Sequence, residues 1–333
     1  MNTKKHFLKT TLIVSFILAG LKPAGAQQNI QFTQYIFNSI SVNPAYAGYK
    51  EEWFGQMAMR TQWVGLDGAP KTGQLSVDGI LDPNKKTTGV GIQIGSDKLG
   101  AQSATSAYIN YAYRLRLNTE DSERLSFGLG VGLTNYGLDY GILRANNPGD
   151  VVVGSTGIVH SLIPDARVGV YYYNPRFYFG VSLMDLFSGD FKDAGTVQNL
   201  KRKRHIYMMA GTIHNLTADI KLKPSILLKE DFKGPTSLDL NGMLIFDEKF
   251  WIGASYRTGM RLWKKDYDPN GALSLINSVS GLVQFYITNK LRVGYSYDYN
   301  LNSLNTMSTG THEITLGITF PKNSGRLLSP RFF

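Results

Sequence analysis

The chain has 333 residues, of which 18% are charged and 43% hydrophobic, with 35 Gly, 19 Tyr, 17 Phe and no Cys. The absence of cysteine excludes a disulfide scaffold, an iron–sulfur cluster, a thiolate metal site and a cysteine nucleophile. The formal net charge is +10, and no apolar run approaches the roughly 20 residues of a spanning helix, which leaves a membrane β-barrel open because alternating strands average to neutral hydropathy.

The first 26 residues have the pattern of a secretory signal peptide. Three lysines precede an apolar stretch at residues 11–21 that is too short to span a bilayer. Ala24-Gly25-Ala26 then fits a small-residue cleavage site. We therefore expect export by the Sec pathway with cleavage before Gln27. We expect no nucleic-acid partner for an exported chain without a basic helix.

Residues 27–50 match neither a barrel strand nor a charged linker, because they hold many aromatic side chains. Exposed rings favour burial, so we expect this segment to be packed in or under the domain that follows, as a plug or a docking element. Its aromatic side chains would brace the interior, and its amides would supply hydrogen bonds. These candidates are Phe32, Tyr35, Phe37 and Tyr46, with Gln34, Asn38 and Asn43.

From residue 51 to 320, apolar and polar residues alternate with a period of two. In residues 218–228, 291–300 and 314–320, apolar side chains alternate with polar residues or glycine. Nearly every strand has one polar face and one aliphatic or aromatic face. In a membrane barrel the polar face lines the lumen and the apolar face contacts lipid. The pattern predicts an all-β fold, a transmembrane antiparallel β-barrel of about fourteen strands. The expected strands are 53–63, 71–80, 87–97, 103–117, 123–137, 165–173, 176–186, 204–214, 217–229, 236–246, 249–260, 271–287, 290–300 and 309–320.

The connections between these strands sort by parity. Those after even-numbered strands are short, as at 174–175 and 288–289, and most of those after odd-numbered strands are longer, as at 138–164. Outer-membrane barrels join short periplasmic turns to long external loops in this way. We therefore place both ends of the barrel on the periplasmic side.

The face assigned to the lumen carries both glycine and charge. Gly128, Gly130 and Gly132 recur every second residue, unlike a nucleotide-binding loop, which needs its glycines at the start of a helix. They predict a wall that bends sharply or that lets another chain lie close to it. Water, a plug or a guest polypeptide could occupy such a lumen. The expected lumen charges are Arg114, Arg167, Lys221, Lys223, Asp239, Arg257, Arg292 and Asp298.

Enzyme signatures are weak in this sequence. His312 beside Glu313, with Asp298 across from it, could form an acid–base pair at the rim, but a histidine in the interfacial zone is the more ordinary interpretation. The basic run at residues 201–204 could bind lipopolysaccharide phosphates or an acidic partner, although most such runs only face solvent. We expect no catalytic residue, no cofactor and no metal.

Nine stretches, in order along nearly the whole mature chain, resemble the PorP/SprF family: QFTQYIFN, NPAYAG, RTQWVGLDGAPKTGQLS, LKPSILLK, SLDLN, FWIGASYRTG, LRVGYSYDY, GTHEITL and SPRFF. Members are outer-membrane proteins of the type IX secretion system in Bacteroidetes, and the family has no catalytic residues to carry over. The resemblance implies an outer-membrane location in a Gram-negative bacterium and a place in secretion and gliding machinery. It adds structural or docking roles for the motif positions Gln34, Tyr35, Asn38, Asn43, Pro44, Arg60, Gln62 and Trp63.

Three functions remain open. The resemblance implies a non-enzymatic barrel that binds the C-terminal domain of a secreted, adhesin-like client and retains this client at the cell surface. It also allows an outer-membrane anchor for periplasmic ring components of the same system. A diffusion channel for small solutes is the third, if residues 27–50 do not fill the lumen.

The expected organisation has four parts. Residues 1–26 are the signal peptide, 27–50 the N-terminal segment, 51–320 the outer-membrane barrel and 321–333 a C-terminal tail. Outer-membrane lipid and lipopolysaccharide are the expected surroundings. Barrel-assembly signals usually end in an aromatic residue, which Phe320 or the terminal Arg331-Phe332-Phe333 could supply.

Overall fold

The computed structural model describes residues 32–143, 157–187, 190–191, 200–201, 203–232, 234–262 and 275–320. The expected signal peptide, residues 27–31, the tail 321–333 and Arg202 of the basic run lie outside these residues. Among the described residues, no helix has the length and apolar character needed to cross a membrane.

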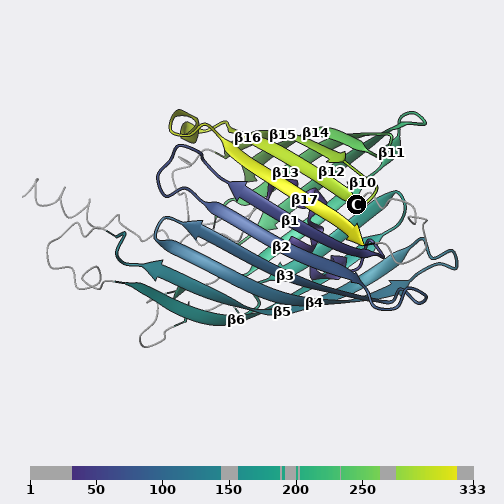
Figure 1. Ribbon diagram of the computed structural model, residues 1–333, viewed down its shortest axis with the longest axis horizontal. Coiled ribbons are helices and arrows are strands. Elements are labelled where there is room, and N and C mark those ends of the chain that lie inside the picture. The colour runs from purple at the N-terminus through teal and green to yellow at the C-terminus, as the bar shows by residue number, and fades with distance from the viewer. Residues whose placement is uncertain are drawn as a thin grey trace, which may run out of the picture.

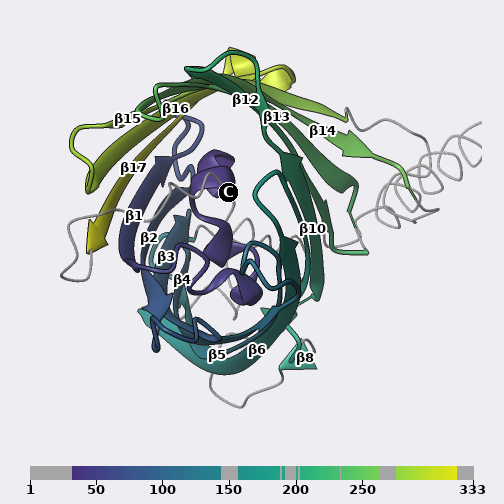
Figure 2. The same ribbon diagram turned by 90° about the vertical axis from the view of Figure 1, so that its right-hand side faces the viewer.

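Within the described part of the chain, fourteen antiparallel strands close into a barrel, as the sequence predicts (Figures 1 and 2). Each strand pairs with the next, β1 pairs with β17, and β10 lies between β7 and β12. Outside the ring, β8 (Asp190–Phe191) pairs with β9 (Leu200–Lys201), and β11 (His214–Asn215) adds to β12. The strands of the ring are β1 (Trp53–Thr61), β2 (Lys71–Ile80), β3 (Thr88–Leu99), β4 (Gln102–Arg116), β5 (Arg124–Asp139), β6 (Ile158–Tyr173), β7 (Phe177–Met184), β10 (His205–Thr212), β12 (Ile220–Glu230), β13 (Thr236–Phe246), β14 (Phe250–Met260), β15 (Ile276–Tyr286), β16 (Leu291–Asn300) and β17 (Thr311–Phe320).

The two faces of the wall follow the alternation in the sequence. On β5, Leu129 and Val131 point outward and are about half exposed, at 49% and 51%. Gly128 and Gly130, which alternate with them, face the lumen and are buried. An outward apolar face and an inward polar or glycine face are what a membrane barrel requires, because lipid offers no hydrogen bonds.

The two rims of the barrel differ in their connections. One rim, called here the short-turn rim, holds the tight connections after β6 and β15 and also the start of β1 and the end of β17, where Trp53 pairs with Phe320. The other rim, the long-loop rim, holds the longer connections, although β3 and β4 are joined there by only two residues. Most loop lengths therefore follow strand parity, as expected.

Several strand boundaries differ from the expected ones, as at β12, which begins at Ile220 rather than at 217, and at β15, which begins at Ile276 rather than at 271. Two of the differences have a clear physical cause. β6 begins at Ile158 rather than at 165, because its first residues pair with the outer end of β5, from Asp139 down to Leu133. The alternation in this stretch is obscured by Pro164, which cannot donate to the ladder and so does not read as a strand residue. β1 ends at Thr61 rather than at 63, since Trp63 has a positive φ of 48°.

The rims give a test of topology in a chain that has no cysteine. We expect Asp67→Cys, exposed in the long-loop rim, to react with a membrane-impermeant maleimide on intact cells. We expect Asn289→Cys, exposed in a short turn, to react only after lysis. Mass-tagging on a gel gives the labelled fraction of each variant, and surface labelling at Asn289 alone would mean that the barrel is inverted.

The two faces give a test of the lipid boundary. Val168 points outward with 38% of its surface exposed, whereas the neighbouring Arg167 points into the lumen and is buried. Val168→Arg places a charge in lipid at a cost of roughly 2–4 kcal/mol near the bilayer midplane. We expect this variant to lose the heat-modifiable, membrane-inserted form on gels, and Arg167→Val to keep it. Equal behaviour of the two variants would contradict the assignment of faces.

Candidate functional site

The lumen contains the chain's own N-terminal segment, called here the lumenal segment, residues 32–50. Figure 2 looks into the barrel from the short-turn rim and shows this segment inside the ring of strands. Residues 32–40 and 42–49 are buried. The segment starts near β16 and β17 and ends at the short-turn rim, where β1 begins.

Three short 3₁₀ turns form the lumenal segment: η1 (Thr33–Phe37), η2 (Ser39–Ser41) and η3 (Pro44–Tyr46). Asn43 caps η3, because its side-chain oxygen accepts from the backbone N–H of Ala45 at 2.9 Å, and Pro44 occupies the first position, where no N–H is needed. Frequent turns keep the segment compact within the barrel.

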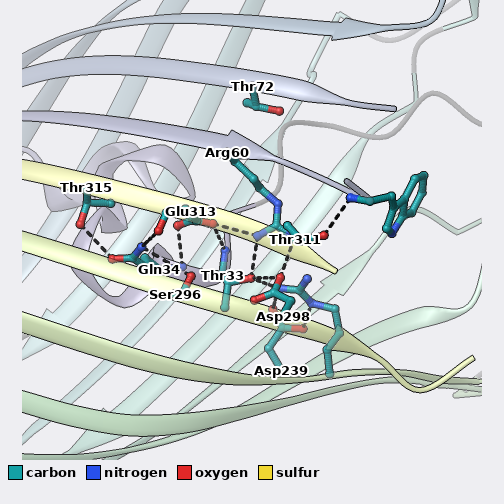
Figure 3. A network of polar contacts seen from close by, with 12 residues as sticks. Thr33, Gln34, Arg60, Thr72, Asp239, Ser296, Asp298, Thr311, Glu313 and Thr315 are labelled. Atoms are coloured by element: carbon teal, nitrogen blue, oxygen red, sulfur yellow. Dashed lines mark hydrogen bonds and ion pairs between the residues drawn. The ribbon is translucent and has the colours of Figure 1, made fainter. Parts of the chain in front are cut away.

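The start of the lumenal segment is fixed by one buried carboxylate of β17. Glu313 accepts the backbone N–H of Thr33 at 2.8 Å and that of Gln34 at 2.9 Å, one on each oxygen. Arg60 of β1 donates to the same carboxylate at 2.9 Å and to Asp298 of β16 at 2.7 Å. The Thr33 hydroxyl donates to Asp298 at 2.7 Å. Figure 3 shows these contacts, which join the first, last and penultimate strands through the segment.

A third carboxylate completes the charge balance of this cluster. Asp239 of β13 accepts from Arg257 at 2.8 and 3.1 Å and from Lys229 at 2.9 Å. Arg257 also reaches the Thr33 hydroxyl at 3.5 Å. With Arg60, Asp298 and Glu313, three cations face three carboxylates. Buried charges are tolerated when paired and hydrogen-bonded, and removal of one partner is costly.

The side chain of Gln34 continues the contact along β17. Its amide donates to the carbonyl of Glu313 at 3.0 Å and accepts from the Thr315 hydroxyl at 2.8 Å. Gly294 on β16 leaves room for it, since a Cβ there would come within 2.5 Å of the Gln34 oxygen. The side chain of Gln34 thus bonds both to the backbone and to a side chain of β17.

The glycines of the wall are points where the lumenal segment comes very close. A Cβ on Gly89 would lie 2.0 Å from the carbonyl oxygen of Ala47, and one on Gly128 would lie 2.1 Å from the backbone nitrogen of Ala45. The sequence predicted a sharp bend or the close approach of another chain, and at these positions it is the protein's own lumenal segment that comes close. Gly130 instead makes room for a wall side chain, Arg167.

The end of the lumenal segment packs through aromatic rings and an ion pair. Tyr46 stacks on Tyr49 at 4.9 Å between ring centroids, and Tyr49 meets Tyr173 edge-on at 4.7 Å. Glu51, just after the segment, pairs with the buried Arg114 at 3.1 Å and with Lys86 at 2.9 Å. Both ends of the segment are therefore held by charged groups.

The turn from the lumenal segment into β1 carries a lysine against an aromatic ring. The Lys50 ammonium lies 4.4 Å from the centroid of the Phe54 ring, and the Arg292 guanidinium lies 4.6 Å from the same centroid. Burial lowers the pKa of Lys50 well below its ordinary value, and repulsion by Arg292 lowers it further. Burial also raises the pKa of the neighbouring Glu52 carboxyl.

Most of the candidate residues predicted from the sequence gather in the lumen. Tyr35 accepts a hydrogen bond from Asn241 at 2.6 Å, and Asn43 donates to the carbonyl of Val170 at 3.0 Å. Gln62 and Trp63 lie apart from them, half-buried in the loop at the long-loop rim. The buried candidates are Phe32, Gln34, Tyr35, Phe37, Asn38, Asn43, Pro44, Tyr46 and Arg60.

The predicted lumen charges face inward, and all but one are buried. The exception is Lys221, which is half-buried and pairs with Glu248 at the short-turn rim. The buried ones are Arg114, Arg167, Lys223, Asp239, Arg257, Arg292 and Asp298. Glu313, Lys229 and Glu51 were not among the residues assigned to the lumen from the sequence.

The suggested acid–base pair of His312 and Glu313 is wrong. The two residues are neighbours on β17 and therefore point to opposite faces. His312 lies outside, with its Nδ1 2.7 Å from the hydroxyl of Tyr295, whereas Glu313 holds the lumenal segment inside. Alternation with Thr311 and Thr315 was the signal that could have placed Glu313 in the lumen. Among the described residues, no three His, Cys, Asp or Glu side chains gather as a metal site.

The fold is that of an outer-membrane β-barrel, and solved structures of this class resemble it. The toluene transporter TbuX of Ralstonia pickettii superposes with a TM-score of 0.52 at 9% identity, over 85% of this chain and 93% of that one. The monoaromatic hydrocarbon channel CymD gives 0.51 at 13% identity, over 90% and 96%. No protein of curated function matches in sequence. Identities this low establish the fold alone.

The family profile is more specific. The profile described as type IX secretion system membrane protein PorP/SprF matches residues 24–318, which is most of the chain. The chain therefore belongs to the PorP/SprF family, and the resemblance seen in its motifs is confirmed.

The buried carboxylate of Glu313 gives a test of the anchor. We expect Glu313→Gln to lower the stability of the inserted barrel by about 3 kcal/mol, because Arg60 and two backbone N–H groups lose a charged partner. Urea unfolding of the purified barrel in detergent measures the change. His312→Gln, one residue away on the outer face, is the matched control and should change stability by less than about 1 kcal/mol. Equal losses in the two variants would contradict the anchoring role.

Proposed function

We propose that this barrel retains a secreted protein at the cell surface, holding it from the long-loop rim while the lumenal segment occupies the lumen. The type IX secretion family supports this proposal, because its members serve protein secretion. The client would be an adhesin-like protein that carries a C-terminal secretion domain. The chain would reach the outer membrane of a Bacteroidetes-like bacterium after Sec export and removal of residues 1–26.

The placement of the lumenal segment is the observation that carries the proposal. Below mid-depth it contacts opposite parts of the wall: Gly48 donates to Asp78 of β2 at 2.8 Å, and Arg292 of β16 donates to the carbonyl of Phe37 at 2.7 Å. Asn43 reaches β6 in the same half. A lumen crossed in this way favours binding over free diffusion of solutes.

The two alternative functions, a periplasmic anchor and a solute channel, predict different experimental results. An anchor for periplasmic ring components would bind at the short-turn rim, where Lys86 and Glu51 already form an ion pair with each other. A solute channel would conduct ions in a planar bilayer. Neither has a specific structural feature that favours it over client retention.

Crosslinking from the two rims tests the proposal. A photo-crosslinking amino acid at Asp67 lies on the long-loop rim, and one at Asn289 lies on the short-turn rim. We expect the secreted client to be captured from position 67 and not from position 289. Capture of periplasmic components from position 289, with nothing from position 67, would favour the anchor function instead.

Variants of two aromatic residues can distinguish docking of the client at the rim from docking that depends on the lumenal segment. Trp63 is half-buried at the long-loop rim, and Tyr35 is 1% exposed inside. We expect the double variant Tyr35→Ala, Trp63→Ala to insert but to release the client into the medium, because truncating an aromatic anchor typically costs about 2 kcal/mol or more. The fraction of client retained on cells, normalised to inserted barrel, is the measurement.

The single variants and conductance complete this test. If Trp63→Ala alone releases the client, the rim makes the contact, and if only Tyr35→Ala does so, the lumenal segment supports it. Full retention in the double variant would remove both residues from docking. Full retention together with new ion conductance would favour the channel.

A further inference from the structure

The outer half of the lumen holds a cavity of about 150 Å³ above the lumenal segment. Ser41 of the segment forms part of its floor, and the outer ends of β3 and β4, at Leu99 and Gln102, form part of its mouth. On the other side it is lined by His205 and Tyr207 of β10. The cavity therefore lies between Ser41 of the lumenal segment and the long-loop ends of β3, β4 and β10.

Arg167 of β6 lies in the wall of this cavity with one edge of its guanidinium unused. The side chain is 8% exposed, and its NH1 donates to Gln93 at 3.1 Å. Its Nε is buried and has no hydrogen-bond partner among the described residues. The guanidinium lies over the ring of Tyr108, 3.3 Å from the centroid. The group is thus held in place in the cavity wall with its Nε unpaired.

Two other buried arginines of the lumen pair with carboxylates, and a third, Arg292, donates instead to the carbonyl of Phe37 and to the amide oxygen of Gln56. Arg60 pairs with Asp298 and Glu313, and Arg257 pairs with Asp239. Arg167 has no ion pair in the described part of the chain. A buried guanidinium without a carboxylate is costly, so its most favourable partner is an anion that arrives in the cavity.

The wall is shaped to place this arginine. Gly130 lies directly opposite Arg167 in the ladder, and a Cβ at position 130 would come within 2.5 Å of the Arg167 side chain. The glycine therefore gives the arginine stem the room to cross β5. This explains a lumen glycine that does not contact the lumenal segment.

The carboxylates that line or adjoin the cavity already have partners. Asp97 accepts from the Thr72 hydroxyl at 2.5 Å, and Asp185 lies 2.9 Å from His205. Asp165, two residues before Arg167, accepts from the Tyr108 hydroxyl at 2.8 Å. None of them bonds to the guanidinium of Arg167.

The remaining lining suits a peptide backbone. Gln74 is 6% exposed, and its Nε2 has no partner in the described residues. Gln93, Gln102 and several hydroxyl side chains line the same space. Amides and hydroxyls both donate and accept, which matches the alternating C=O and N–H groups of an extended chain.

We propose that this cavity binds the terminal carboxylate of an extended polypeptide that enters from the long-loop rim. Arg167 binds the carboxylate through its Nε edge, in the side-on geometry that a guanidinium offers to carboxylates, and Gln74 binds the adjoining backbone. The proposal rests on the proposed function, in which the occupant is the end of the secreted client. A cavity of about 150 Å³ takes only the last residues of such a chain.

The test uses the full barrel, purified in detergent, and a peptide probe. The probe is acetyl-triglycine with a free C-terminal carboxylate, and its comparison is the same peptide ending in an amide, with affinities from isothermal titration calorimetry. We expect the amide form, and the variant Arg167→Gln with the acid form, each to bind roughly 30-fold more weakly. Arg167→Lys keeps the charge without the planar fork and should fall in between.

Controls separate binding from folding and from nonspecific attraction. Arg176→Gln removes an exposed arginine from the short-turn rim and should leave the affinity of the acid form unchanged. The heat-modifiable band confirms that each variant is inserted and folded. No binding of the acid form, or equal binding of acid and amide, overturns the proposal. Binding of acetate or inorganic phosphate as tight as that of the peptide identifies a free anion site and overturns the polypeptide part.

A cell assay distinguishes failure of this inference from failure of the proposed function. If client retention is lost without the barrel but persists in Arg167→Gln, the cavity is not the docking site, whereas surface retention by the barrel stands. If retention persists without the barrel, the proposed function itself is wrong. Loss of retention in Arg167→Gln, with an inserted barrel and normal retention in Arg176→Gln, supports both.

Discussion

The structure depends on one buried carboxylate that is shared between the wall and the main chain of the lumenal segment. Glu313 takes two consecutive backbone N–H groups and the guanidinium of Arg60, and Arg60 also pairs with Asp298. The contact therefore links β16, β17 and β1, where the two ends of the barrel meet. Ring closure and placement of the segment are therefore coupled energetically. The strands that meet at the closure supply the buried charges, and the segment supplies N–H and hydroxyl groups that these charges need as partners.

This arrangement makes the short-turn half of the lumen resemble a protein core. Aromatic rings of the segment pack against tyrosines of the wall, and glycines of the wall let the backbone approach to contact distance. Because polar wall groups bond to the segment instead of to water, the polar inward face that membrane barrels share becomes a specific binding surface for the barrel's own chain.

The part of the lumen next to β3, β4 and β10 is built differently. There the wall side chains bond mainly to each other, as Thr72 does to Asp97 and Tyr108 to Asp165, and a cavity remains above the segment. The segment thus runs along one side of the lumen toward the long-loop rim and leaves a cavity on the other side.

The sequence by itself determined the barrel, its strand number, the two faces and the sorting of loops, because period-two alternation and turn length are local properties. It also marked the aromatic segment and seven of the buried charges. Only the tertiary structure decided which charges meet: Glu313 lies some 280 positions from Thr33 and Gln34, and His312 lies beside it yet on the other face. Strand register and ring closure decide which inward side chains meet when they are this far apart in the sequence. A single sequence does not reveal either of them.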